Sequence, residues 1–382
     1  MSALYGNRLR RLEALGQSLW LDHIDRALLV NGGLERLIGD DGISGVTSNP
    51  AIFEKAIAQH AEYDAAITRL ARNGLGAQAI YETLAIEDVC RAADLLRDVY
   101  ETSCRRECCG RDGYVSLEVS PQLAYDTAAT VAEATRLWNR VGRPNLMIKV
   151  PATRAGLPAI RHLTAVGINV NVTLLFSVAR YREVSENYLA GLEDRLANGG
   201  AIDHVTSVAS FFLSRIDALV DGFLDRENRA RARELRGDAL RGRAAIACAR
   251  LAYQEYQRLV RGARWQALAA RGAHPQRLLW ASTSAKNPAY DDLMYVEALI
   301  GQDTINTLTP ETVITYRDHG HPELRLKREL DAARELPGQL AALGLELDVV
   351  GDELERQGVQ KFIEPYERLL ATLVRRAAEL AT

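Results

Sequence analysis

Short apolar stretches alternate along this chain with longer segments of helical periodicity that are rich in Ala, Leu, Glu and Arg. Eight of these stretches have the length and the β-branched content of strands. They are residues 19–22, 43–49, 114–119, 145–150, 168–175, 204–210, 277–282 and 304–308. Strands that alternate with helices in this way are typical of parallel βα units, and eight such units close a barrel. The sequence therefore predicts an α/β protein with the (β/α)8 TIM-barrel fold.

The chain has 382 residues, more than the roughly 250 that a typical barrel needs. We expect one domain over residues 1–382, because no low-complexity linker or fixed-period repeat divides it. The surplus residues form two helical segments, an insertion at about 215–273 and a C-terminal extension at about 322–382 that should pack around the barrel. Helix breaks in the extension are expected at Pro337, Gly338 and Gly351.

Charge and hydropathy exclude several classes of partner. The chain has 47 basic and 50 acidic residues, with no run of like charge that could bind a nucleic acid backbone. Residues 1–20 lack the continuous apolar stretch of a secretory signal, and the most apolar segment is interrupted by Asn169 and Asn171, so no membrane span is expected. These features predict a cytoplasmic protein that binds neither nucleic acid nor membrane.

Three of the five cysteines, Cys104, Cys108 and Cys109, crowd into the motif SCRRECCG. Thiols beside arginines are reactive, so a zinc or redox site is one interpretation. The segment has no CxxC pair and no nearby histidine at ligand spacing. A solvated loop is therefore the prediction we favour.

The C-terminal ends of the predicted strands carry polar side chains. They are Asp22, Asn49, Glu118, Lys149, Asn171, Thr173, Ser210, Ser282, Thr307 and Thr309. Strand ends of a TIM barrel meet at one pocket, so these side chains are predicted to lie together. Ser and Thr at such positions also commonly cap the next helix, which is the alternative for Ser210, Thr307 and Thr309.

Glu118 and Lys149 interrupt the otherwise apolar strands YVSLEV and NLMIKV. A buried charge is costly unless it is paired or serves a function. A structural ion pair is one interpretation, and a catalytic site is the one we favour. A lysine removed from water releases its proton more easily, and the neutral amine can attack a carbonyl carbon to form a Schiff base. Asp22 and Glu118 are suited to the acid/base and water-handling steps that follow.

Six motifs, GVTSNPAIFEKAI, YVSLEVSP, NLMIKVPAT, NVNVTLLFS, VASFFLSRID and RLLWASTSAKNP, strongly resemble those of transaldolases of the longer bacterial branch. The resemblance covers residues 19–312. It implies a class I aldolase barrel that needs no metal and no organic cofactor. It also implies transfer of a dihydroxyacetone unit from sedoheptulose 7-phosphate or fructose 6-phosphate to glyceraldehyde 3-phosphate or erythrose 4-phosphate, in the non-oxidative pentose phosphate pathway.

The catalytic roles that the resemblance implies fall on four residues. Lys149 in MIKVPAT matches the Schiff-base lysine, and Asp22 in LWLD matches the acid/base that assists carbon–carbon cleavage. Glu118 in SLEVSP and Thr173 in NVTLLFS match the pair that holds the catalytic water.

The implied substrate-binding residues are four others. Asn49 and Asn171 match the residues that hydrogen-bond the hydroxyls of the dihydroxyacetone unit, Ser210 matches a substrate-contacting serine, and Arg215 matches a phosphate-binding arginine.

The seventh strand departs from the family pattern. The shorter branch supplies a second arginine to the phosphate there, but WASTSAKNP offers Ser284 at that place. Ser282 and Lys286 are the candidates to share the phosphate, and an exposed loop charge is the alternative for Lys286.

Two other functions compete with transaldolase. A related Schiff-base sugar-phosphate aldolase would release the three-carbon product, but relatives of that kind look shorter and tend to carry glutamine where Glu118 stands. A catalytically idle barrel that binds sugar phosphates or assembles with a partner is the second alternative. A homodimer and a monomer both remain open.

Overall fold

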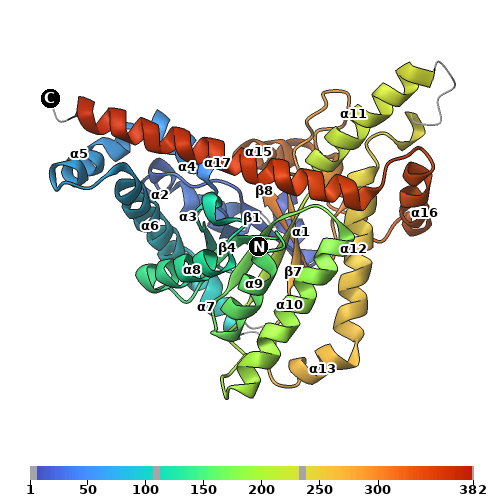
Figure 1. The fold of residues 1–382 in the computed structure, drawn as a ribbon, viewed down its shortest axis with the longest axis horizontal. Coiled ribbons are helices and arrows are strands. Elements are labelled where there is room, and N and C mark those ends of the chain that lie inside the picture. Colours follow the sequence, from blue (N-terminus) through green and yellow to red (C-terminus); the bar gives the residue numbers. More distant parts are fainter. Residues whose placement is uncertain (1–6, 106–111, 232–237, 381–382) are drawn as a thin grey trace.

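The computed structural model describes residues 7–105, 112–231 and 238–380, which form a closed barrel of eight parallel strands surrounded by helices (Figure 1). The strands follow one another around the barrel in chain order, and β8 closes it by pairing with β1. Their bounds are β1 Gln17–Leu21, β2 Ile43–Val46, β3 Tyr114–Glu118, β4 Leu146–Pro151, β5 Val170–Leu175, β6 Ser207–Phe212, β7 Arg277–Ala281 and β8 Thr304–Leu308. Each overlaps one predicted strand, so the predicted TIM-barrel fold is confirmed.

Helices occupy most of the connections between strands. The α-helices are α1 Arg8–Ala14, α2 Arg26–Val30, α3 Gly33–Arg36, α4 Pro50–Gln59, α5 Asp64–Arg72, α6 Ala77–Leu95, α7 Arg97–Arg105, α8 Thr127–Val141, α9 Gly156–Ala165, α10 Val178–Ala197, α11 Ser214–Arg231, α12 Ala244–Arg261, α13 Ala263–Ala269, α14 Met294–Ala298, α15 Pro310–His319, α16 Leu330–Ala341 and α17 Leu347–Glu379. Within the described residues, no helix combines the length and the apolar character that crossing a membrane requires. Cys108 and Cys109 lie outside the described residues, as does the side chain of Cys104.

Side-chain caps fix where several helices begin. Asn49 caps α4 by accepting from the Ile52 N–H, and Pro50 fits the first helical position because it has no N–H to leave unpaired. Thr309 caps α15 as the capping alternative predicted. That alternative is wrong for Ser210 and Thr307, which lie inside β6 and β8, where the barrel's inward register places their side chains.

The N-terminal end of the barrel is filled by Trp20 and closed by a polar network. Trp20 Nε1 donates a hydrogen bond of 3.1 Å to Asp112, whose carboxylate also accepts from Ser18 at 2.8 Å and pairs with Arg277 at 3.3 Å. Gly45 on β2 faces the indole, and a Cβ atom there would lie 2.5 Å from the ring. The interior of the barrel at this end is therefore occupied by side chains.

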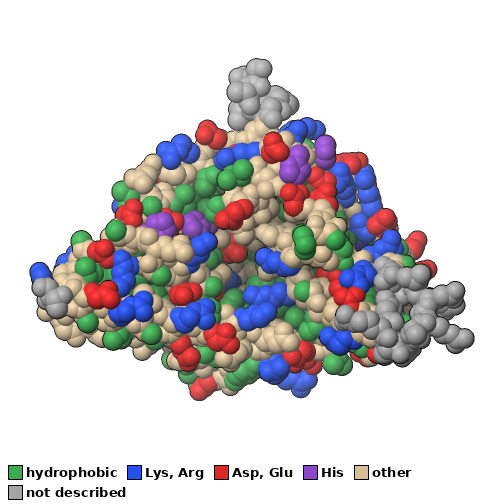
Figure 2. Space-filling view, turned by 90° about the horizontal axis from the view of Figure 1, so that it is seen from above, with side chains coloured by type: hydrophobic (Ala, Val, Ile, Leu, Met, Phe, Trp, Pro, Cys, Tyr) green, Lys and Arg blue, Asp and Glu red, His purple; other side chains and the backbone are tan. Residues whose placement is uncertain are grey.

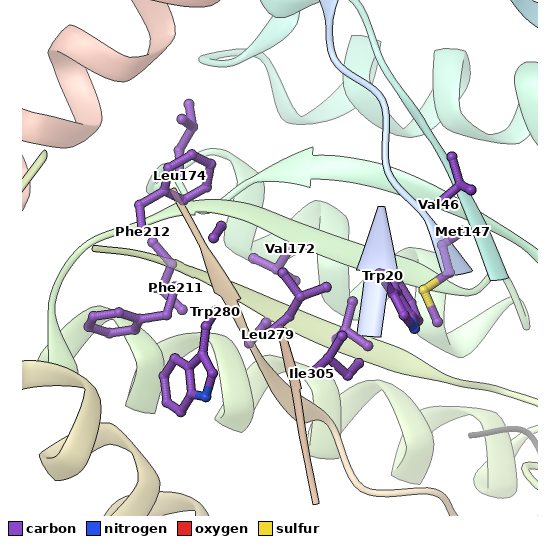
Figure 3. Packing of buried hydrophobic residues seen from close by; sticks show 14 of the residues in the cluster. Trp20, Val46, Met147, Val172, Leu174, Phe211, Phe212, Leu279, Trp280 and Ile305 are labelled. Atoms are coloured by element: carbon purple, nitrogen blue, oxygen red, sulfur yellow. The ribbon is translucent and has the colours of Figure 1, made fainter. Parts of the chain in front are cut away.

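Alternate strand residues point outward and pack the barrel against its helices. Phe211 and Trp280 lie side by side on neighbouring strands with their ring centroids 6.4 Å apart in an edge arrangement (Figure 3). Both side chains are fully buried. Because β6 and β7 are covered on this outer side, the polar residues of their sequences are confined to the inner side and the strand ends.

The C-terminal extension is helical as expected, but the predicted breaks are wrong. Residues Pro337 and Gly338 lie inside α16, because Ala333, Leu336 and Leu340 form a buried stripe that holds this helix in place. The break falls instead between α16 and α17, where Gly344 has a φ of 90°.

Glycine in α17 serves close packing and does not end the helix. A Cβ atom at Gly351 would lie 2.7 Å from Ser177, and one at Gly358 would lie 2.9 Å from Leu174. Figure 1 shows this long helix (red) crossing the molecule from α16 to the region of α4 and α5, and it contacts α4, α5, α6 and α11. The extension therefore crosses the barrel mouth, a more specific arrangement than packing around the barrel.

Gly45→Ala should destabilise the protein, because the added methyl group would overlap the Trp20 ring inside a filled barrel. We expect a loss of about 2 kcal/mol in the free energy of unfolding, measured by urea denaturation. Gly39→Ala is the matched control, since a Cβ atom at Gly39 would meet no other atom within 4 Å, and it should change stability by less than about 0.5 kcal/mol. Equal effects of the two substitutions would contradict the packing argument.

Candidate active site

A cavity of about 150 Å³ lies at the C-terminal end of the barrel strands. Six of the predicted site residues line it, namely Asp22, Asn49, Lys149, Ser210, Arg215 and Ser282. This space and its polar lining suit a small polar fragment. Figure 2 shows a hollow near the middle of the face seen from above, with Lys and Arg side chains at its edge.

Lys149 and Glu118 form a buried ion pair beside this cavity. They are register partners on the adjacent strands β4 and β3, and Lys149 Nζ lies 3.6 Å from Glu118 Oε2. Their side chains are only 5% and 4% exposed. Lys149 Nζ also donates a hydrogen bond of 3.2 Å to the Ser48 carbonyl oxygen. The amine is thus held in place by a carboxylate and a backbone carbonyl, away from bulk water.

The Glu118 carboxyl group is poised to exchange a proton near neutral pH. Burial raises its pKa to about 7, the Asp22 charge adds to the rise, and the Lys149 ammonium opposes it. Glu118 Oε2 accepts no hydrogen bond from any described residue. A carboxyl group in this state can give or take a proton during a reaction.

Thr173 lies on β5, on the other side of Lys149 from Glu118. Its Oγ1 is buried and makes no hydrogen bond within the described part of the chain. Thr173 and Glu118 therefore offer two unused polar groups on the strands that flank the lysine. This placement is compatible with the predicted pair that holds a water molecule.

Asp22 follows β1 and reaches the cavity, where the Thr47 hydroxyl donates a hydrogen bond of 2.8 Å to its Oδ1. This bond fixes the carboxylate through one of its two oxygens. Thr47 itself lines the cavity and was not anticipated from the sequence, because a threonine inside a predicted strand carries no distinguishing signal.

The two predicted asparagines are placed differently. Asn49 lines the cavity, and since its Oδ1 caps α4, its amide nitrogen is the group left to donate to a ligand. Asn171 is fully buried and is not among the cavity-lining residues. It donates to Ser116 Oγ at 2.9 Å and accepts from Ser210 Oγ at 2.7 Å, so it orients the serine that does reach the cavity.

Arg215 lies in the first turn of α11 at the edge of the cavity. Burial lowers its pKa, and its Nη1 is buried without a hydrogen-bond partner among the described residues. The Ser214 hydroxyl beside it is likewise buried and unpartnered there. An arginine that keeps free donors at a helix N-terminus is a suitable ligand for a phosphate group.

Of the two seventh-strand candidates for phosphate binding, Ser282 lines the cavity and Lys286 does not. Ser282 lines the cavity and has a φ of 55°, a left-handed conformation that is rare for residues other than glycine. Lys286 is exposed and is not among the lining residues, and Ser284 is hydrogen-bonded to Thr312 at 3.1 Å.

Two lining residues come from the C-terminal extension, which the sequence predicted only to pack around the barrel. The Phe362 ring lies 5.7 Å from Lys149 Nζ, and Lys361 lines the same cavity. The available signal was that Lys361 is the only lysine in α17. Its approach to a strand more than 200 residues earlier in the chain could not be inferred from spacing.

Comparison with known proteins agrees with this geometry. The family described as Transaldolase/Fructose-6-phosphate aldolase matches residues 19–373. This chain belongs to that family. A protein named Transaldolase from Thiobacillus denitrificans is 48% identical over 367 residues, which cover 96% of this chain and 99% of the relative. Transaldolase 2 of Nostoc punctiforme is 48% identical over 373 residues, covering 96% and 97% of the two chains.

A more distant relative extends this similarity. A protein named Transaldolase from Mycobacterium leprae is 44% identical over 375 residues, covering 97% of this chain and 96% of the relative. The similarity therefore includes the C-terminal extension, and the family resemblance inferred from the six motifs is confirmed.

Glu118→Gln should alter how stability depends on pH. Because the pKa of Glu118 is raised in the folded protein, its proton stabilises the fold fully below pH about 4.5, and this contribution is lost as the pH rises through about 7. The stability of the parent relative to the variant should therefore fall between pH 5 and 8, by on the order of 2 to 3 kcal/mol.

Denaturation in urea at several pH values measures this difference. Glu335→Gln, which changes an exposed carboxylate on α16, is the control and should give a difference that does not vary with pH. A pH-independent difference for Glu118→Gln would contradict the raised pKa.

Proposed function

We propose that this chain is a transaldolase that carries a dihydroxyacetone unit as a Schiff base on Lys149. The observation that carries the proposal is a buried amine 3.6 Å from a carboxyl group whose pKa is raised to about 7, at the cavity of a TIM barrel. Near-full-length similarity to proteins named transaldolase supports the same conclusion.

The reaction begins when the Lys149 ammonium passes a proton to the Glu118 carboxylate, and the neutral Nζ attacks the C2 carbonyl carbon of a ketose phosphate. As the C–N bond forms, the amine gives a second proton to the former carbonyl oxygen. The first product is a carbinolamine, which loses its hydroxyl group as water to form the iminium. Glu118 is the proton donor for this loss, and Glu118 with Thr173 holds the departing water. Both groups flank Lys149 on adjacent strands and have unused hydrogen-bonding capacity.

Cleavage follows because the iminium accepts the electron pair of the C3–C4 bond. Asp22, oriented by Thr47, takes the proton of the C4 hydroxyl as the aldose phosphate leaves. The three-carbon enamine stays on Lys149 until an acceptor aldose phosphate enters and the steps run in reverse. Asn49 and Ser210 contact the three-carbon unit, and Asn171 orients Ser210 through their hydrogen bond.

The substrates in this proposal are phosphorylated sugars. Sedoheptulose 7-phosphate and fructose 6-phosphate are the donors, and glyceraldehyde 3-phosphate and erythrose 4-phosphate are the acceptors. Arg215 and Ser282 bind the phosphate group at the edge of the cavity. In this proposal the enzyme acts in the cytoplasm, in the non-oxidative pentose phosphate pathway.

Borohydride reduction in the presence of fructose 6-phosphate tests the Schiff base. We expect a reduced dihydroxyacetone adduct on Lys149, found by mass mapping of the modified peptide, and a loss of turnover by at least about 10³-fold in Lys149→Met. Lys327→Met is the control, because Lys327 lies on another surface against Tyr253, and it should retain full labelling. A folded parent protein that gives no adduct on any lysine would sink the proposal.

The family description also includes fructose-6-phosphate aldolase, which releases the three-carbon product. The two activities differ in whether the enamine waits for an acceptor. We expect turnover of fructose 6-phosphate to require an acceptor aldehyde and initial-rate plots against both substrates to be parallel, as a ping-pong order demands. Steady release of dihydroxyacetone without an acceptor, or intersecting plots, would favour the aldolase.

A further inference from the structure

The C-terminal helix brings an additional cation to the active-site cavity. Lys361 on α17 lines the same cavity as Arg215 and Ser282. We propose that Lys361 binds the phosphate group of the sugar substrate together with Arg215. The inference rests on the proposed function, which it deepens by assigning a phosphate ligand to the C-terminal extension.

The position of Lys361 is fixed by its neighbours on α17. Gly358, about one turn earlier, lets the helix approach Leu174 at the barrel rim. Phe362, the next residue, is buried and places its ring 5.7 Å from Lys149 Nζ. Since the helix also contacts α11, which carries Arg215, the two cations come from neighbouring helices that border one cavity of about 150 Å³.

Within the described residues, Lys361 has no ion-pair partner, whereas two arginines that follow it on α17 are paired. Arg368 and Arg376, which follow it on α17, form ion pairs with Glu54 and Asp64. Among the residues that the structure describes, neither Lys361 nor Arg215 has a carboxylate within ion-pair distance. Such unpaired cations at a cavity are available to an anionic ligand.

The charge balance of the cavity suits a phosphate monoester. Lys149 is paired with Glu118, and the rest of the described cavity lining holds one carboxylate, Asp22, and two further cations, Arg215 and Lys361. A phosphate monoester carries about −1.5 to −2 charges at pH 7 and can satisfy both cations. Lys286, the candidate suggested by the sequence, is exposed like Lys361 but, unlike Lys361, is not among the residues that line the cavity.

A lysine also suits substrates of different length. The proposed donors have six or seven carbons, so their phosphate groups lie at different distances from the carbon bound to Lys149. Arginine offers a rigid fork, whereas the lysine ammonium is a point charge on a flexible stem. Arg215 then orients the phosphate group through its rigid guanidinium, and the flexible Lys361 side chain moves to contact the phosphate of either donor.

Lys361→Met tests this role, because it removes the charge and keeps most of the stem. We expect the KM for fructose 6-phosphate to rise about tenfold with kcat nearly unchanged, while kcat/KM for unphosphorylated fructose stays at the parent value. Binding of inorganic phosphate, measured by calorimetry, should weaken by a similar factor. Lys361→Arg should restore most of both affinities.

Two further variants separate this role from its alternatives. Arg356→Ala changes an exposed residue of the same helix that pairs with nearby Glu353, and it should behave as the parent. Equal losses for fructose and fructose 6-phosphate in Lys361→Met would overturn the proposal, since they indicate a role in covering the cavity. Loss of phosphate affinity in Lys286→Ala and not in Lys361→Met would overturn it as well.

The phosphate titration keeps this inference distinct from the proposed function. If the parent protein transfers no ketol unit but its phosphate affinity depends on Lys361, transaldolase activity is refuted and the phosphate role is upheld. If transfer is normal and Lys361→Met binds phosphate as tightly as the parent protein, the phosphate role alone is refuted.

Discussion

The burial of Lys149 beside Glu118 is the constraint on which the site depends. Two opposite charges at 3.6 Å can be kept from water only where the surrounding structure compensates their lost hydration. Here the barrel provides that compensation through the Ser48 carbonyl, which accepts from the amine, and through the adjacent strand positions that hold the pair in register. Burying the pair costs folding free energy. The same burial raises the pKa of Glu118 to about 7, which makes its carboxyl group able to transfer a proton near neutral pH.

The N-terminal end of the barrel contributes mainly to stability, and the C-terminal end carries the site. At the N-terminal end, the Trp20 ring of β1 packs against Gly45 of β2 and donates a hydrogen bond to Asp112. At the C-terminal end, polar side chains replace apolar ones, and several keep hydrogen-bonding groups unused. The C-terminal end, where polar side chains line a cavity, is therefore the end at which a ligand is accepted.

The extension changes this arrangement from an open barrel to a covered one. Its helix α17 passes across the mouth, where Phe362 faces Lys149. Gly351 and Gly358 make the close approach possible, which explains why Gly351, expected to end a helix, lies within one. An aromatic ring above the lysine limits the water around the amine, so the extension contributes to the environment that the pair requires.

The sequence by itself determined the eight strands and the barrel, because strand length, β-branched content and the alternation of strands with helical segments are visible along the chain. It also singled out Glu118 and Lys149, since a charge in an apolar strand is visible without coordinates. Only the tertiary structure decided that Asn171 orients Ser210 without lining the cavity, that Lys286 stays outside, and that Lys361 reaches the cavity. These outcomes depend on the path of loops and of α17 across the mouth, which is set by packing between segments far apart in the chain and leaves no local pattern.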